Sequence, residues 1–201
     1  MSIANKNQYW NTRMKGENPT TSTDNAFSGS GGSYVDGYWV TTNSSYSIST
    51  TSGGAYTLLS AFSYNTAPNN NDVLLSIDNG VKKIELKSKG NTTQLDLVGN
   101  TTITISDLDL NESEDNPAPT IIRLTLDADG NAKLYLYDNI RDADGIDNFY
   151  SVVGATSSAT SLSFGNNSGS VKWASVYVST TGAFNPEELM VSDFAQDALV
   201  R

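Results

Sequence analysis

Four aspartates within one short segment have the residue type and spacing of a cation site. They are Asp138, Asp142, Asp144 and Asp147. Calcium takes about six to eight oxygen ligands, which carboxylates and carbonyls supply. The EF-hand pattern does not fit, because Ile140 would fall at its first ligand position. The segment therefore predicts either a calcium-binding loop or an acidic turn, since the same Asp-Ala-Asp-Gly string at 127–130 is explained by a hairpin turn. No other cofactor is expected.

Two tyrosines on a predicted strand are candidates for glycan binding. Leu134 and Leu136 face the core, so Tyr135 and Tyr137 share the opposite, solvated face of the strand. Two aromatic rings on a polar surface can stack on a sugar. They can also cover a neighbouring protein or pack under a loop. The alternation leaves these roles open.

The residue types of common hydrolytic catalysis are missing. The chain has no cysteine and no histidine, which excludes Ser-His-Asp and Cys-His sites as well as thiolate and imidazole metal sites. A retaining glycosidase needs two carboxylates about 5–5.5 Å apart. The densest carboxylate cluster, Glu112 to Asp115, precedes Pro117 and Pro119 in a loop and has the wrong spacing for that geometry. We therefore expect a protein that is not an enzyme.

The charge balance limits the partners. The chain carries 12 Lys and Arg against 22 Asp and Glu, a formal net charge of −10. Nucleic acids and anionic lipid surfaces are bound by clustered basic residues, so we expect neither as a partner. No segment approaches the roughly 20 apolar residues of a membrane span, and residues 1–15 lack the apolar run of a signal peptide.

From about residue 34 the hydrophobic pattern has a period of two, which is typical of strands with one buried and one solvated face. The alternating sets are Val73, Leu75 and Ile77; Ile84 and Leu86; Leu95 and Leu97; Ile103 and Ile105; Ile122, Leu124 and Leu126; and Leu134 and Leu136. Turn signals separate them at intervals too short for helical crossovers, which predicts an all-β, antiparallel sandwich or jelly roll. After Ile105 the next two leucines fall on the other parity, which predicts a bulge near Ser106 and Asp107.

The first 33 residues differ in composition from the rest. They are poor in apolar residues and end in a run of Ser and Gly from residue 28 to 33, which predicts an N-terminal arm and flexible linker. One domain, residues 34–201, follows. Tyr9, Trp10 and Phe27 are costly to leave in water, so the arm is expected to order against a partner through them. The alternative is a disordered tail.

One short helix is predicted near the C-terminus. Asn185 is suited to the N-cap, Pro186 to the first helical position and Glu188 to the third, as in a capping box. Phe184 before the cap and Leu189 after it can form a hydrophobic staple. The helix is expected to dock on the domain or on a partner.

The segment from Thr120 to about Phe194 resembles the C-terminal half of concanavalin A-like lectin/glucanase domains of the laminin-G and pentraxin type. Four segments carry the resemblance: the strand pair from Arg123 to Asp138, the turn from Leu162 to Gly165, the strand from Val171 to Val178, and Phe184 to Leu189. The resemblance implies a two-sheet jelly-roll sandwich. Trp173 shares parity with Val171 and Tyr177, and Trp39 lies beside Tyr38 in an expected first strand, so both are expected in the core. Such domains occur in lectins, in glycoside hydrolases and in phage tails, fibres and capsids. The Glu-x-Asp-x-x-Glu motif of the related glucanases is absent from this chain.

Together these observations favour a non-enzymatic structural protein of a phage virion, a lectin-like module that decorates the capsid or forms part of a tail or fibre. Its expected partners are other virion proteins and further copies of itself. Its expected location is the virion, assembled in the host cytoplasm, with an extracellular location as the alternative. The alternative function is a carbohydrate-binding module that recognises a host or environmental glycan, and the two functions are compatible.

Overall fold

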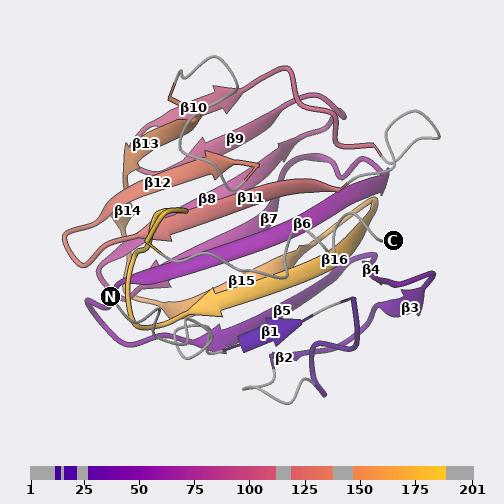
Figure 1. Cartoon of the computed structure of the whole chain (residues 1–201), viewed down its shortest axis with the longest axis horizontal. Helices are drawn as coiled ribbons and strands as arrows, with labels where there is room; N and C mark the ends of the chain where they lie inside the picture. Colours follow the sequence, from indigo (N-terminus) through magenta and orange to yellow (C-terminus); the bar gives the residue numbers. More distant parts are fainter. Residues whose placement is uncertain (1–11, 15, 22–26, 112–118, 138–146, 189–201) are drawn as a thin grey trace.

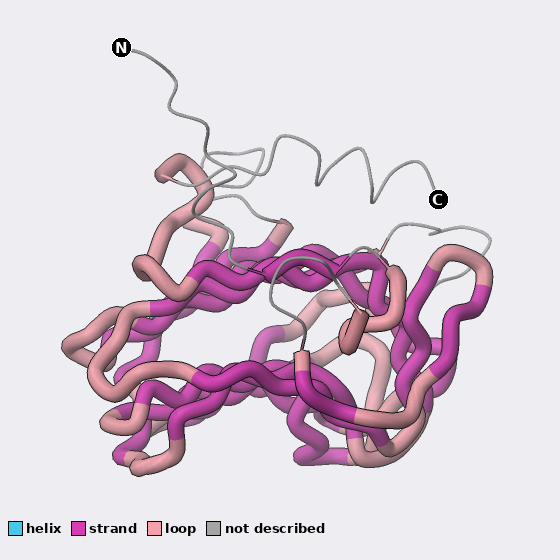
Figure 2. The backbone as a smooth tube through the Cα atoms, turned by 90° about the horizontal axis from the view of Figure 1, so that it is seen from below, coloured by secondary structure: helices cyan, strands magenta, loops and turns pink. Residues whose placement is uncertain are grey.

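The computed structural model describes residues 12–14, 16–21, 27–111, 119–137 and 147–188. These residues form two antiparallel sheets that pack face to face as a sandwich (Figure 2). The jelly-roll prediction is confirmed. Within the described residues there is no helix of the length and hydropathy that a membrane span requires.

Among the described residues each sheet has eight strands. Figure 1 shows how they are arranged. Sheet A runs in the order β13 (Phe149–Val153), β12 (Asn131–Leu136), β11 (Thr120–Leu126), β6 (Tyr56–Thr66), β16 (Ser170–Ser179), β4 (Tyr38–Thr41) and β3 (Ser33–Val35), with β1 (Thr12–Met14) also paired to β16. Sheet B runs in the order β10 (Thr102–Ile105), β9 (Leu95–Val98), β8 (Lys82–Lys89), β7 (Asn70–Asn79), β15 (Thr160–Asn166), β5 (Ser44–Ser49) and β2 (Ser28–Gly29), with β14 (Ala155–Thr156) also paired to β8.

The core lies between the sheets and follows the predicted alternation, except at the start of β7. There the pairing with β8 shifts register, so Leu74 is buried and Val73, predicted to share a face with Leu75 and Ile77, lies at the outer trough. The leucines and isoleucines of β7, β8, β9, β11 and β12 that share one parity are buried. Trp173 of β16 is fully buried, with ring centroids 5.2 Å from Phe62 and 5.0 Å from Phe164. Trp39 is also in the core. Both tryptophans therefore have the structural role that the sequence predicts.

Leu108 and Leu110 are buried, as the sequence predicts, but no β-bulge brings them to the core. The strand ends at Ile105, and Asp107 takes a left-handed backbone conformation with φ of 61°. Leu108 and Leu110 are then buried from a loop, not from a strand. A left-handed residue reverses the direction of the side chains that follow, and Asp tolerates this conformation better than most residues.

The described parts of the first 33 residues belong to the sandwich. β1 pairs with β16, β2 with β5, and β3 with β4, so residues 28–33, which the sequence indicates as a linker, contribute strands to both sheets. Phe27, expected in the arm, is 2% exposed and meets Phe164 edge-to-face at 4.9 Å. Phe27 is a core residue and presents no face to a partner. Tyr9 and Trp10 lie outside the described residues.

The capping box at Asn185 is present. Its side-chain Oδ1 accepts hydrogen bonds from the backbone N–H groups of Glu187 and Glu188, both at 2.9 Å. The Asn185 backbone N–H donates in return to Glu188 Oε2 at 2.9 Å. This reciprocal pattern satisfies donors that the first turn of a helix leaves unpaired. Leu189 and the rest of the predicted C-terminal helix lie outside the described residues.

Candidate functional site

Tyr135 and Tyr137 do not form an aromatic platform. Tyr135 is 3% exposed and packs against Phe149, with ring centroids 5.5 Å apart. Burial raises the pKa of the Tyr135 hydroxyl, and the negative charge of Glu188 raises it further, against the opposing charge of Arg123. Tyr137 is 55% exposed, but it follows the end of β12 in a left-handed conformation with φ of 54°. The two rings therefore have different environments, and only Tyr137 is accessible.

Beside Tyr135, the outer face of sheet A around Arg123 is covered by residues 182–188 near the C-terminus. Arg123, opposite Tyr135 in the sheet, is fully buried and donates to the backbone oxygens of Phe184 at 3.2 Å and Asn185 at 3.0 Å. Thr57 Oγ1 donates to the Gly182 carbonyl at 2.9 Å and accepts from the Phe184 N–H at 2.8 Å. The Phe184 ring packs on a second apolar cluster, formed by Tyr38, Leu59, Ala61, Ala174 and Tyr177. The part of this face around Arg123 and Thr57 is therefore covered by the protein's own chain, whereas Lys133 and Ser151, farther along the same face, are exposed.

The aspartate segment is only partly described. Asp138, Asp142 and Asp144 lie outside the described residues, whereas Asp147 is exposed beside β13. In the part of the chain that the structure describes, no group of three or more Asp, Glu, His or Cys side chains is placed to hold a metal ion. The calcium hypothesis therefore stays a prediction from the sequence.

The outer face of sheet B, in contrast, carries a pocket of about 230 Å³. We call it the serine trough. It is lined by Ser45, Ser76, Asp78, Lys83, Glu85, Ser161, Ser163 and Asn166, with Val73, Leu74, Phe164, Ala159 and Asn167 at its margins. The residues come from β5, β15, β7 and β8 and from the loops beside them, so the trough crosses the strands.

Strand register explains the hollow. Ser163 of β15 stands opposite both Ser47 of β5 and Ser76 of β7, and Ser76 stands opposite Glu85 of β8. In the next row Ser161 stands between Ser49 and Asp78. Serine is among the shortest side chains, so consecutive serines across neighbouring strands leave a depression beside the longer side chains of β8. Three strand spacings of about 4.8 Å give the row a length of roughly 14 Å.

The β8 side of the trough is formed by an ion-pair ladder. Glu85 lies between two lysines on the same strand face: its Oε1 is 2.5 Å from Lys83 Nζ and its Oε2 is 2.9 Å from Lys87 Nζ. Burial of Glu85 opposes its ionisation, but hydrogen bonds and charges from Lys83 and Lys87 outweigh that effect and lower the pKa of the Glu85 carboxyl. Glu85 is therefore ionised and held in place near neutral pH.

Asp78 is also held in a defined orientation. It is 2% exposed; its Oδ2 accepts from Ser157 Oγ at 2.5 Å, and its Oδ1 accepts from the Gly80 N–H at 3.1 Å. A carboxylate accepts up to about four hydrogen bonds, so each oxygen retains capacity for a further donor. The trough thus presents serine hydroxyls, which both donate and accept, beside oriented carboxylate acceptors.

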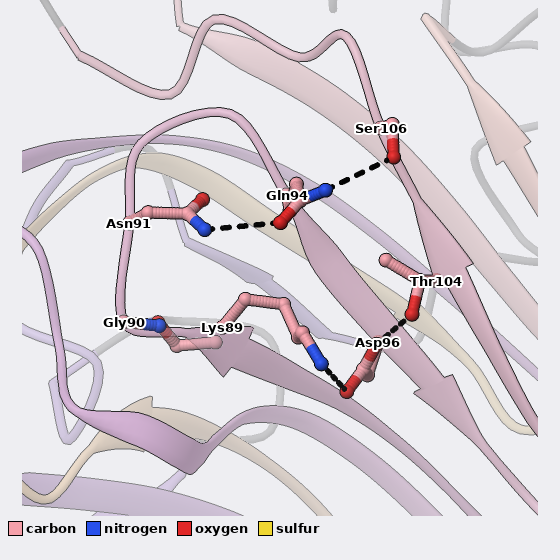
Figure 3. Close-up of polar contacts among 8 residues, drawn as sticks. Lys89, Gly90, Asn91, Gln94, Asp96, Thr104 and Ser106 are labelled. Carbon is pink, nitrogen blue, oxygen red and sulfur yellow. Dashed lines mark hydrogen bonds and ion pairs between the residues drawn. The ribbon is translucent and has the colours of Figure 1, made fainter.

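Polar contacts continue beyond the trough on the same face of sheet B (Figure 3). Asp96 of β9 pairs with Lys89 of β8 at 3.1 Å and accepts from Thr104 Oγ1 of β10 at 2.7 Å. Gln94 connects two loops, because its Oε1 accepts from Asn91 Nδ2 at 3.1 Å and its Nε2 donates to Ser106 Oγ at 3.2 Å. These contacts stiffen the edge of the sheet next to the ladder.

This arrangement is suited to hydrogen bonding with a polyhydroxyl ligand, and Glu85 is not suited to act as a general acid. A general acid needs a carboxyl whose pKa is raised toward the working pH, whereas the pKa of Glu85 is lowered. The carboxylate cluster from Glu112 to Asp115 lies outside the described residues.

The sequence analysis did not single out the trough residues. A signal was present, because serine occupies alternate, outward positions in residues 45–49 and 161–163 and again at 76. In a chain rich in Ser and Thr this alternation is easily taken for ordinary solvated surface. The pairing of β15 between β5 and β7 is what gathers these serines, and it joins segments far apart in the sequence.

The comparisons with known proteins agree with the architecture. No protein-family model matches the chain, and no curated protein matches it. Among solved structures, the binding domain of botulinum neurotoxin DC in complex with SialylT aligns with a TM-score of 0.57 at 10% identity, over 91% of this chain and 50% of that one. The botulinum neurotoxin type C structure described with two ganglioside molecules aligns with a TM-score of 0.58 at 11% identity, over 93% of this chain and 51% of the other.

A sialidase from Trypanosoma rangeli is similar as well. It aligns with a TM-score of 0.64 at 12% identity, over 94% of this chain and 33% of the enzyme, and another structure of that enzyme is in complex with sialic acid. The chain thus spans about half the length of the neurotoxin domains and a third of the sialidase. At these identities the likeness shows only the fold, a two-sheet jelly-roll sandwich.

Proposed function

We propose that this protein is a non-catalytic carbohydrate-binding module and that the serine trough is its glycan site. The observation that carries the proposal is the contrast between the two outer faces. Residues 182–188 cover the face of sheet A around Arg123 and Thr57, whereas sheet B presents a partly exposed hollow of hydroxyl and carboxylate groups.

The chemistry of the trough supports a sugar ligand. A sugar offers many hydroxyl groups in a rigid ring, and each can donate to Asp78 or Glu85 while accepting from a serine hydroxyl. The volume of about 230 Å³ is below the roughly 300 Å³ at which pockets for drug-sized molecules begin, which favours one or two small polar units. Shallow, hydrogen-bonding sites of this kind bind weakly to single sugars and gain strength when several copies act together.

The solved structures add support of a general kind. The neurotoxin domains and the sialidase that share the fold are described with SialylT, ganglioside molecules and sialic acid. These ligands belong to those proteins, and the proposal for this chain rests on its own trough.

A glycan array with matched variants tests the proposal. Ser163→Leu places a larger side chain in the lining of the trough, whereas Ser151→Leu places the same side chain at an exposed position of β13 in the other sheet. We expect wild type and Ser151→Leu to bind a common set of glycans and Ser163→Leu to lose at least about tenfold in affinity, equivalent to about 1.4 kcal/mol. Equal binding by all three, or no binding by wild type, would contradict the proposal.

The sequence-based prediction of a phage virion protein stays a separate proposal, as does membership of the concanavalin A-like family. Composition supports the virion role, and its remaining candidate anchors are Tyr9 and Trp10. Because β1 belongs to sheet A, the informative deletion is residues 1–11, which spares every described strand. Loss of the truncated protein from purified particles, with an unchanged melting temperature, is the outcome expected for a virion arm.

A further inference from the structure

The lysines that face the serine trough and its continuation are matched by carboxylates. Lys83 and Lys87 both contact Glu85, and Lys89 contacts Asp96. Asp78, also on the trough, is held by a hydroxyl and a backbone N–H, not by a cation. Three lysines are thus paired with the two carboxylates Glu85 and Asp96, beside Asp78, and the whole chain carries a formal net charge of −10.

From this arrangement we infer that Glu85 is a specificity-determining residue: by engaging Lys83 and Lys87 it restricts the trough to uncharged sugars and excludes carboxylated ones. The inference rests on the proposed function, because it assigns the ligand class of the same site. It departs from the likeness in fold, since sialic acid, which is described with one of the similar structures, carries a carboxylate.

The first physical reason is the placement of Glu85. Its side chain is 14% exposed and lies between the two lysines, so both carboxylate oxygens are engaged. An anionic sugar would have to draw a lysine away from Glu85. The partly buried carboxylate of Glu85 would then lose one of the two lysine charges that offset its burial. An uncharged sugar needs no such change, because its hydroxyls can donate to the free lone pairs of Glu85 and Asp78.

The second reason is repulsion. A carboxylated sugar in the trough lies beside two carboxylates, and juxtaposed like charges disfavour a complex strongly. The side chain of Lys83 is 38% exposed, so solvent screens part of its attraction for a ligand anion. The negative net charge of the chain acts in the same direction at longer range.

The decisive experiment compares neutral glycans with the same glycans extended by a terminal sialic acid. The variants are Glu85→Gln, the triple variant Glu85→Gln with Lys83→Met and Lys87→Met, and the control Glu187→Gln. Glu187 is exposed in the segment over sheet A, so its substitution changes the net charge equally but far from the trough. Binding is measured on an array and then by titration calorimetry at low and high salt.

We expect wild type and Glu187→Gln to bind the neutral members at least about tenfold more tightly than their sialylated partners. Glu85→Gln frees two lysines, so the ratio of the affinity for neutral glycans to that for sialylated glycans should fall by about tenfold or more. High salt should reduce this change, because it screens the lysine charges. The triple variant, which also lacks both lysine charges, should not show the increased affinity for sialylated glycans. This result would show that the increase in Glu85→Gln comes from the freed lysines and not from a change in the fold.

Two results would overturn the inference. Preferential binding of sialylated glycans by wild type would refute the inference that the trough selects uncharged sugars, and it would leave the proposed function intact. An unchanged ratio in a folded Glu85→Gln protein would refute the role of Glu85. Absence of binding to every glycan would instead refute the proposed function, and this inference with it.

Discussion

Replacement of Phe27 by alanine tests whether the N-terminal segment is part of the folded domain. Phe27 is 2% exposed, lies in the main core and meets Phe164 edge-to-face at 4.9 Å. Removing a buried phenylalanine side chain costs about 3–5 kcal/mol, through lost burial and the cavity left behind. For a domain of this size each kcal/mol lowers the melting temperature by roughly 2–4 °C, so we expect a decrease of about 6–20 °C.

The assay is equilibrium unfolding in urea, with thermal unfolding as a second measurement. Tyr34→Ala is the matched control, because Tyr34 is 64% exposed on the edge strand β3 of the same N-terminal region. Its loss should change the unfolding free energy by less than about 0.5 kcal/mol. If Phe27→Ala is no more destabilising than Tyr34→Ala, residue 27 is not in the core and the placement of β2 and β3 is wrong.

Three further predictions follow from the packing and the charges. Arg123→Met leaves the carbonyls of Phe184 and Asn185 without their donor, so it should cost about 1–3 kcal/mol and accelerate proteolysis of residues 182–188; unchanged cleavage would contradict the docking of that segment. Because the lysines lower the pKa of Glu85 below its ordinary value of 4.5, its ionised form stabilises the fold above that pH, and this contribution is lost as the pH falls through the lowered pKa. The stability advantage of wild type over Glu85→Gln should therefore shrink below pH 4.5, and an advantage that grows there would reverse the sign. Tyr137→Ala, at an exposed site outside the trough, should leave glycan affinity within about twofold, and a large loss would move the site to that loop.

The two-sheet architecture could be predicted from the sequence because alternation is a local signal. Leu124 and Leu134 each alternate with polar neighbours, and they pair across the predicted hairpin. The turn at 127–130 is likewise local: Asp127 accepts from both the backbone and the side chain of Asn131, and Gly130 has φ of 90°. The capping box that begins at Asn185 also acts within one helical turn, so it too could be predicted from the sequence.

The burial of Tyr135 and Phe27 could not be predicted in this way, because it depends on segments distant in the sequence. Alternation places Tyr135 on the outer face of sheet A correctly, but there its ring packs against Phe149, beside the part of the face that residues 182–188 cover at Arg123. Phe27 follows polar residues and precedes a Ser/Gly run, yet the pairing of β2 with β5 brings its ring against Phe164. A polar composition describes a segment's average and does not exclude one buried anchor.

The serine trough was hidden for a related reason. Ser76, Ser161 and Ser163 are unremarkable one strand at a time, and they form a hollow only when β15 is placed between β5 and β7. The ion pairs of Glu85 with Lys83 and Lys87 are local to β8, but their proposed role in ligand selection depends on the trough formed by the neighbouring strands.

The central claim, that the outer face of sheet B binds glycans, is tested most directly by mapping the bound sugar by NMR. Backbone amide shifts are followed while the uncharged oligosaccharide that binds best on the array is titrated into the isotope-labelled protein. We predict saturable shifts centred on Ser76, Glu85 and Ser163, with none at residues 182–188. Shifts centred on Tyr137 and the neighbouring loop, or no saturable shift on sheet B, would contradict the account.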